Sequence, residues 1–185
     1  DERDGASLEG AEGPFRMKRN ALHIWPRRSY MMMALPNADG SFTCTLFAPY
    51  EGPDGLNGIR TPADVRRYFE ERFPDAIPVM PTLEEDFLSN PTGSLVTVRC
   101  YPWSIGGTAT LVGDAAHAVV PFYGQCMNAS FEDVVALGEA IEAHPDDLAR
   151  AYDVYQQRRK PNADAIAQLA VDHFVEMRDK VGSPA

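Results

Sequence analysis

The chain has 185 residues, of which 44% are hydrophobic and 24% are charged, and its net charge is −10. This composition is typical of a soluble globular protein with enough apolar residues for one ample core or two small lobes. The negative charge argues against a nucleic-acid partner, because phosphate binding requires a basic surface. No apolar run approaches the roughly 20 residues that a membrane-spanning helix needs, so we expect no membrane segment in this chain.

The chain contains three cysteines and four histidines. An odd number of cysteines without a Cys-x-x-Cys pair argues against a disulfide framework and against structural zinc. The histidines are scattered and form no metal-binding pattern, so we predict no metal site. A reducing interior is the simplest compartment for such a chain.

The first part of the chain has the pattern of an antiparallel sheet. Residues 1–14 are acidic and rich in glycine, and we expect them to form a flexible, exposed segment. Strands are predicted over 21–25, 30–35 and 41–48, with a strong hairpin turn at 36–40.

Alternation along these strands predicts one mostly apolar sheet face. Met31, Met33 and Leu35 share one face of their strand. Phe47 shares one face of the next strand with two threonines, because alternate side chains point to the same side.

Capping residues and prolines mark the helices that follow. Thr61 is predicted as an N-cap with Pro62 at the first helical position, and the helix ends before Pro74. A short helix is predicted over 83–88. Residues 95–100 alternate again, and we expect them to rejoin the sheet as a strand.

The C-terminal part is predicted to be helical. One helix covers 128–143, and a second opens at 146–147 and is broken or kinked by Pro161. A last helix spans 162–180. The basic cluster 158–160 is predicted to be a solvated helix face or a local anchor. The fold class is therefore α+β, with an antiparallel sheet and flanking helices.

The most informative stretch, residues 111–133, reads LVGDAAHAVVPFYGQCMNASFED. An apolar strand, residues 109–112, ends at Gly113-Asp114, a turn of small residues follows, and a helix begins near Met127. The strand end offers a carboxylate, and the helix start offers free backbone N–H groups. Such an arrangement suits a ligand with hydroxyls and an electron-rich edge.

This stretch closely resembles the second flavin motif of the FAD-dependent aromatic hydroxylases, GD-x-A-H-x-x-x-P-x-x-G-Q-G-x-N. Blocks at 22–27, 31–37, 69–78 and 174–178 are similar to the kynurenine branch of that family. The resemblance covers about residues 15–181. It implies that this chain contains the substrate-domain sheet, followed by the strand and helices with which the polypeptide returns to the FAD domain.

The resemblance implies a set of residues that bind FAD. Asp114 would contact the ribityl chain, although a turn or helix cap is the alternative role for this carboxylate. The backbone from Gly124 to Asn128 would lie against the pyrimidine edge of the flavin. Cys126 stands where the family has glycine. The complete implied set is Gly113, Asp114, Pro121, Gly124, Gln125, Cys126, Met127 and Asn128.

The resemblance also implies a substrate pocket. His173 stands where the family has asparagine, and Met177 matches the family's methionine four residues later. A core histidine is the alternative for His173, and packing alone is the alternative for the aromatic and strand residues. The complete implied set is Met31, Met33, Leu35, Phe47, Phe122, Tyr123, His173 and Met177.

No residue is assigned as catalytic, because in this family the cofactor carries the chemistry. His117 is expected to have a structural hydrogen-bonding role. The implied reaction uses NADPH, FAD and O₂ to hydroxylate L-kynurenine to 3-hydroxykynurenine. Two alternatives stay open: a related hydroxylase acting on another tryptophan-derived or anthranilate-like aromatic, and a flavin-free structural or binding fragment.

The sequence contains no G-x-G-x-x-G pattern. The βαβ unit that holds the FAD pyrophosphate is therefore absent, and the chain is either a fragment or one piece of a cut or split protein. The missing N-terminal half, as a separate chain, is a candidate partner. The chain ends without a hydrophobic tail, so we expect a cytoplasmic protein. The predicted divisions are 1–14, 15–104 for the substrate sheet, 105–144 for the flavin-contacting segment, and 145–185 for the C-terminal helices.

Overall fold

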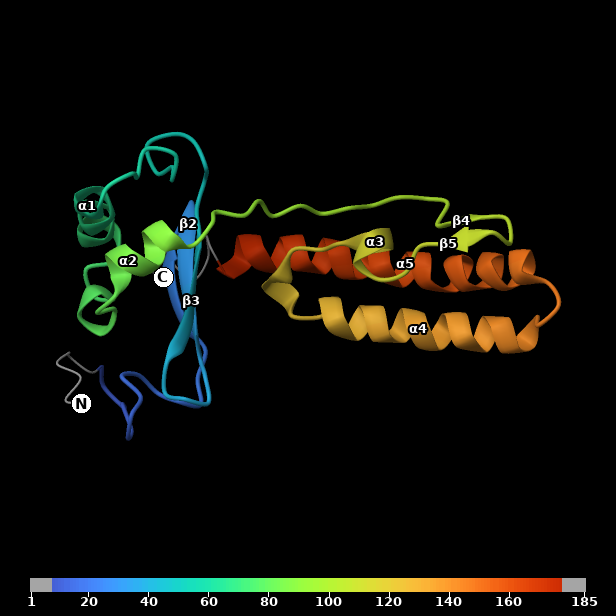
Figure 1. Ribbon diagram of the computed structural model, residues 1–185, viewed down its shortest axis with the longest axis horizontal. Helices are drawn as coiled ribbons and strands as arrows, with labels where there is room; N and C mark the ends of the chain where they lie inside the picture. The colour runs from blue at the N-terminus through green and yellow to red at the C-terminus, as the bar shows by residue number, and fades with distance from the viewer. Residues whose placement is uncertain (1–7, 178–185) are drawn as a thin grey trace. The chain divides into compact units, whose positions relative to one another are not determined.

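The computed structural model describes residues 8–177, which form two compact units. The first unit contains the chain up to Thr92 together with Met177, and the second contains Gly93–Glu176 (Figure 1). Parts of our predictions that fall on residues 1–7 and 178–185 lie outside the described residues. Within the predicted flexible segment, Leu8 donates its N–H to the carbonyl of Arg16 at 2.8 Å.

A three-stranded antiparallel sheet forms the first unit, as the alternation predicts. Its strands are β1 (His23–Arg27), β2 (Tyr30–Pro36) and β3 (Phe42–Phe47), in that order. The predicted hairpin turn joins β2 to β3, and its Gly40 has a φ of 89°, which favours glycine.

The core of the first unit lies on one face of this sheet. Trp25, Met32 and Ala34 are buried there, together with aromatic residues of the following helices. The stripe that we singled out lies on the other face, because its β2 residues alternate with Met32 and Ala34 along the strand. Met31 pairs with Phe47 in the β2–β3 register, so these two residues share that face. Met31 is fully buried, whereas Leu35 is 46% exposed. The stripe is therefore not the core of its own unit.

The helices of the first unit begin where their capping residues predict. In α1 (Pro62–Arg72), the Thr61 side chain accepts the backbone N–H of Asp64, which completes a capping box. A 3₁₀ turn, η1 (Ile77–Val79), and α2 (Leu83–Ser89) follow. Phe69 and Phe73 bury their rings against each other, with centroids 5.6 Å apart, and anchor α1 to the core.

The prediction of a strand over residues 95–100 is wrong. This segment is extended but has no regular strand pairing. Its partners belong to the second unit: Val98 donates its N–H to the carbonyl of Ala118 at 2.7 Å, and Cys100 Sγ bonds the carbonyl of Ala116. The two compact units divide after Thr92.

Two long antiparallel helices dominate the second unit, α4 (Cys126–Ala143) and α5 (Leu148–Val175) (Figure 1). They are preceded by a two-residue ribbon of β4 (Ser104–Ile105) with β5 (Ala109–Thr110). Small residues let the helices pack closely. The buried residues of the two helices are Ala129, Asp133, Ala136, Ala140, Ala151, Tyr155, Gln156, Arg159, Ala163, Ala167 and Ala170.

Pro161 does not break the helix that contains it. α5 runs continuously through this residue, so the predicted separate helix over 162–180 is not formed. A proline removes one backbone hydrogen bond, to the carbonyl four residues earlier. Both Pro161 and Gln157 lie on the exposed side of α5, so the released carbonyl is not in the interior. Burial of Arg159 and Ala163 on the opposite side holds the helix together.

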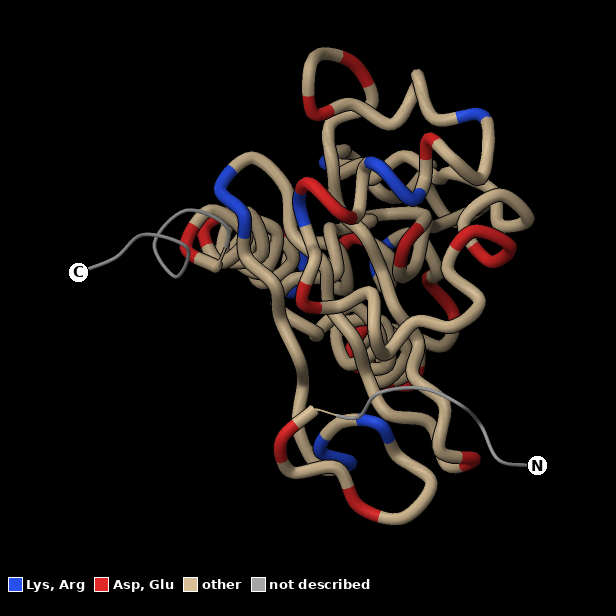
Figure 2. Tube along the Cα trace, turned by 90° about the vertical axis from the view of Figure 1, so that its left-hand side faces the viewer, with Lys and Arg blue, Asp and Glu red and all other residues tan. Residues whose placement is uncertain are grey.

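None of the helices in the described part of the chain combines the length and apolarity needed to span a membrane. Acidic and basic residues are interspersed along the trace (Figure 2).

Candidate functional site

The Gly-Asp turn begins at a glycine that no other residue replaces easily. Gly113 has a φ of 62°, in the left-handed region. A Cβ built on it would lie 3.0 Å from Ser130 Oγ of α4. Both the backbone conformation and the contact therefore require glycine, and the turn is held against the first turns of α4.

Asp114 follows directly and is exposed. It opens the single-turn helix α3 (Asp114–His117), in which the N–H groups of Ala116 and His117 both donate to the carbonyl of Gly113. No capping bond from a side chain is formed at this end. The Asp114 carboxylate is therefore available to accept hydrogen bonds from a ligand.

A second glycine precedes α4. The 3₁₀ turn η2 (Pro121–Tyr123) ends at Gly124, which is exposed and left-handed with a φ of 67°. A Cβ at Gly124 would meet nothing within 4 Å. Its flat backbone thus faces open space, where a planar ring could approach closely.

The N-terminus of α4 has no side-chain cap. Gln125, at the N-cap position, accepts the amide of Asn128 at 2.9 Å. The first intrahelical bond runs from the N–H of Ala129 to the carbonyl of Gln125. The N–H groups of 126–128 therefore precede the helical ladder and give this end a partial positive charge.

Cys126, which replaces the family's glycine, is turned back toward the preceding loop. Its Sγ lies 3.6 Å from the carbonyl of Val119 and is half-buried. The thiol therefore contacts the backbone of the preceding loop.

Behind the turn lies a buried ionic cluster that sequence reasoning missed. Asp133 has no exposed surface, and its Oδ2 accepts the N–H of Gly113 at 3.0 Å and bonds His117 Nε2 at 2.5 Å. Its Oδ1 accepts Arg159 Nε at 2.7 Å. Arg159 is only 4% exposed and also donates to the carbonyl of Ala129.

The cluster stabilises charge on each member. The hydrogen bond to Asp133 raises the pKa of His117. Burial opposes ionisation of Asp133, but hydrogen bonds from His117, Arg159 and Gly113 outweigh it and lower the pKa of this carboxyl. The expected structural role of His117 agrees with this geometry, since the ring is buried and bonded within the protein.

A signal for this cluster exists in the sequence. Asp133 lies four residues after Ala129 and three before Ala136, within the buried stripe of α4. Arg159 likewise lies four residues after the buried Tyr155. Opposite charges at core positions of two neighbouring amphipathic helices indicate a buried ion pair.

The basic cluster 158–160 divides between the two roles that we predicted for it. Arg159 is the buried anchor. Arg158 is exposed and pairs with Glu139 at 2.5 Å, and Lys160 pairs with Asp164 on the same helix.

Aromatic rings join η2 to the end of α5. Phe122 stacks on Phe174 with a centroid separation of 4.3 Å, and Tyr123 contacts His173 edge-to-face at 5.8 Å. His173 is half-buried and Tyr123 is 43% exposed. These two rings therefore touch each other directly.

The remaining predicted substrate residues belong to the first unit. Met31, Met33, Leu35 and Phe47 lie on its sheet, and Met177, which is buried, is grouped with that unit as well. The structure thus brings together Phe122, Tyr123 and His173 within the second unit, and the strand residues within the first.

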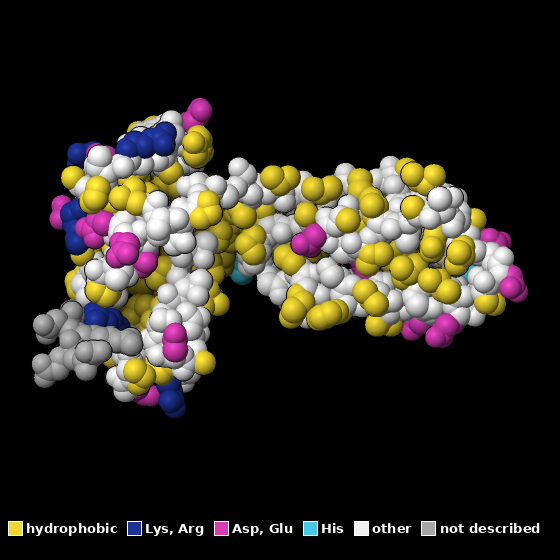
Figure 3. All heavy atoms as spheres, viewed as in Figure 1, with side chains coloured by type: hydrophobic (Ala, Val, Ile, Leu, Met, Phe, Trp, Pro, Cys, Tyr) yellow, Lys and Arg dark blue, Asp and Glu magenta, His cyan; other side chains and the backbone are white. Residues whose placement is uncertain are grey.

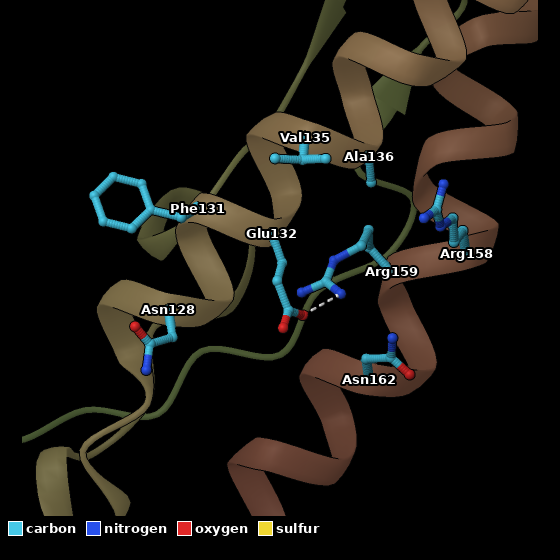
Figure 4. A pocket seen from close by; sticks show the side chains of 8 residues that line it. All are labelled: Asn128, Phe131, Glu132, Val135, Ala136, Arg158, Arg159 and Asn162. Carbon is cyan, nitrogen blue, oxygen red and sulfur yellow. Dashed lines mark hydrogen bonds and ion pairs between the residues drawn. The ribbon is translucent and has the colours of Figure 1, made fainter.

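The outer face of α4 is apolar. Phe131, Val134 and Val135 are each about 60% exposed, at 63, 60 and 59%. Figure 3 shows hydrophobic side chains gathered along this helix. Next to them, an open hollow of about 610 Å³ lies between α4 and α5, with Glu132 and Arg159 joined across it (Figure 4). A helix that is apolar on two faces is typical of a domain interior.

Comparisons with known proteins agree with the geometry of the turn. The FAD binding domain family matches residues 80–170. The matched region contains the turn, so the class of protein that this part of the chain resembles is the FAD-binding proteins.

Within that class, the chain is similar to kynurenine 3-monooxygenases. It is 51% identical to the enzyme of Flavobacterium johnsoniae over 92% of this chain and 38% of that protein. It is 50% identical to the enzyme of Dictyostelium discoideum over 94% of this chain and 40% of that protein. The chain thus spans about two fifths of the length of these relatives.

Solved structures show the same fold at low identity. Klebsiella pneumoniae HpxO, complexed with FAD and uric acid, has a TM-score of 0.68 and 20% identity over 95% of this chain and 43% of that one. A tetrameric 2-methyl-3-hydroxypyridine-5-carboxylic acid oxygenase has a TM-score of 0.64 and 24% identity over 82% of this chain and 39% of that one.

Proposed function

We propose that this chain is part of a flavin-dependent monooxygenase that hydroxylates L-kynurenine to 3-hydroxykynurenine with NADPH and O₂. One observation carries the proposal: the exposed Asp114 directly follows Gly113, which packs against Ser130 near the uncapped start of α4, in a chain about half identical to kynurenine 3-monooxygenases. A carboxylate and a positive helix end recognise two different parts of one flavin, its hydroxyls and its electron-rich ring edge.

The residues present fit the isoalloxazine end of FAD. Asp114 would accept hydrogen bonds from the ribityl hydroxyls, and the N–H groups of 126–128 would stabilise negative charge at the pyrimidine edge of the ring. Gly124 leaves space for a flat ring to approach the backbone. When bound, FAD would accept electrons from NADPH and use them to activate O₂.

The chain's own contribution would be to orient the aromatic substrate and to exclude water from it. We assign Phe122, Tyr123 and His173 to this task. His173 is half-buried and contacts the ring of Tyr123. In this proposal its imidazole donates a hydrogen bond to the substrate carboxylate, and Tyr123 packs on the substrate ring.

A dinucleotide-binding unit would complete this site. The sequence has no glycine-rich pyrophosphate cradle, and the relatives are more than twice as long as the matched region. We assign the outer face of α4, formed by Phe131, Val134 and Val135, to the contact with that unit. Leaving these side chains in water opposes solubility, whereas burying each one fully stabilises a contact by about 1.5–3 kcal/mol.

Titration with FAD tests the proposal. We expect the chain alone to bind FAD with a dissociation constant above about 1 μM, which corresponds to about −8 kcal/mol, because the pyrophosphate contacts are missing. Adding the part of the Flavobacterium johnsoniae enzyme outside the matched region should lower the constant below that value.

Two variants locate the effect. Asp114→Ala should weaken FAD binding in the assembly, and Val135→Asp should prevent assembly. Leu169→Asp, at a comparably exposed position of α5, should have neither effect. Sub-micromolar binding by the isolated chain would refute the need for a second unit. Unchanged FAD affinity of Asp114→Ala would refute the assignment of the turn.

A further inference from the structure

We propose that Asp133 is a positioning residue: it clamps both ends of the Gly113–His117 turn onto α4 and thereby sets where Asp114 lies relative to the helix N-terminus. The consequence for the cofactor rests on the proposed function. The clamp itself is a property of the buried cluster.

A single carboxylate oxygen holds the two ends of the turn. Asp133 Oδ2 bonds the N–H of Gly113 at 3.0 Å and the imidazole of His117 at 2.5 Å. Between these two contacts lie the three residues 114–116, so Asp114 projects from a loop that is fixed on either side. The carbonyl of Gly113 adds bonds from within the turn, and among the described residues Asp133 is the side chain that hydrogen-bonds the turn at both of these points.

The second carboxylate oxygen fixes the clamp. Oδ1 accepts Arg159 Nε at 2.7 Å, and Arg159 donates in addition to the carbonyl of Ala129, one turn earlier on α4. The carboxylate therefore cannot rotate without losing a charge-assisted bond in a buried place. α5 thus holds the rotamer of Asp133, and Asp133 holds the turn.

The chemistry of the site requires a carboxylate. Donors face both oxygens of Asp133: a backbone N–H and an imidazole on one, a guanidinium on the other. An asparagine has only one acceptor oxygen, so its NH₂ group would face a donor in either orientation. A leucine would leave the Gly113 N–H and the Arg159 charge buried without partners.

The clamp links the two proposed FAD contacts through a rigid element. Asp133 lies about two turns after the start of α4, on the same helix as the free N–H groups of 126–128. Gly113 is further held against Ser130. The position of Asp114 relative to the helix start therefore follows from α4 itself and not from the connecting loop 118–125.

The test compares two adjacent carboxylates. Asp133→Asn removes the clamp. Glu132→Gln is the matched control, because Glu132 also bonds Arg159, at 2.7 Å, but forms no hydrogen bond or ion pair with residues 113–117 and is largely exposed. Both variants weaken the pairing of Arg159, so a merely structural effect would appear in both.

The primary readout is NMR of the full chain. In Asp133→Asn, amide exchange of Gly113 and Asp114 should accelerate by at least about tenfold, and the His117 titration should return toward its ordinary midpoint, because one charge-assisted partner is lost. Glu132→Gln should change neither. Equal changes in the two variants, or no change in Asp133→Asn, would overturn the clamp.

A second variant decides the matter if Asp133→Asn does not fold. His117→Gln releases one end of the turn and leaves the Asp133–Arg159 pair in place. It should accelerate exchange at 114–117 while exchange in the middle of α4 stays unchanged. An unaltered turn in this variant would overturn the proposal.

A second measurement is the FAD affinity of this chain assembled with the complementary part of the Flavobacterium johnsoniae enzyme. It tests whether the clamp positions the cofactor contact, separately from whether the clamp holds the turn. A loss of at least about tenfold in Asp133→Asn, and none in Glu132→Gln, supports positioning of the cofactor contact. An altered turn with unchanged FAD affinity overturns it. If the unmodified assembly binds no FAD, the proposed function fails, and the NMR comparison still decides whether Asp133 holds the turn.

Discussion

Two neighbouring arginines provide a direct test of the buried cluster. We expect Arg159→Met to destabilise the second unit far more than Arg158→Met. Arg159 is 4% exposed and bonds Asp133, Glu132 and the carbonyl of Ala129. Methionine retains the apolar length of the side chain and removes only the charge and its donors.

The expected magnitude follows from burial. Removing one partner of a buried ion pair costs about 3–5 kcal/mol, because the other charge stays in the interior. His117 still pairs with Asp133 after the change, so we expect about 3 kcal/mol. Arg158 pairs with Glu139, but both side chains are more than half exposed, at 56 and 54%. An exposed pair contributes about 0–1 kcal/mol.

Urea unfolding followed by tryptophan fluorescence measures the difference. Trp103 is 2% exposed and packs in the core of the second unit, with its ring 5.3 Å from that of His117. Trp25 belongs to the first unit, so Trp25→Phe in all proteins restricts the signal to the second. The slope of the free energy of unfolding against urea concentration should be the same in both variants. Free energies of unfolding that differ by less than about 1 kcal/mol would refute the reasoning.

Two further predictions concern pH and substrate. Because Asp133 raises the pKa of His117, the stability from this pair is fully present below the ordinary value of 6.5 and is lost as pH rises through the higher folded-state value. Urea unfolding at increasing pH above about 6.5 should therefore show falling stability in the parent chain but not in His117→Gln, and parallel curves would contradict this. In the assembly, His173→Ala should weaken kynurenine binding without affecting FAD, and His173→Asn should keep or improve it. If a titration shows that His173→Ala lowers the affinities for kynurenine and for FAD equally, His173 serves packing alone.

Local signals predicted the parts of the fold that depend on local chemistry. The Thr61 cap, the hairpin turn at 36–40 and the start of α4 follow from residues next to each other in the chain. The strand predicted at 95–100 failed for the opposite reason. Alternation indicates an extended backbone, but it does not identify the partner, and here the partners are Ala116 and Ala118 in the second unit.

The Gly-Asp turn illustrates why part of the candidate site was predictable and part was not. The sequence alone predicts the roles of Gly113, Asp114 and Gly124, because a left-handed backbone and an exposed carboxylate are properties of single residues. Asp133 is harder to assign, because its partner Arg159 lies 26 residues away and only the packing of α5 on α4 brings the two side chains together. A carboxylate at a buried helix position is too costly to persist without such a partner. Its presence in an alanine stripe is therefore itself evidence that something must be held there, and the structure identifies the held element as the turn that presents Asp114.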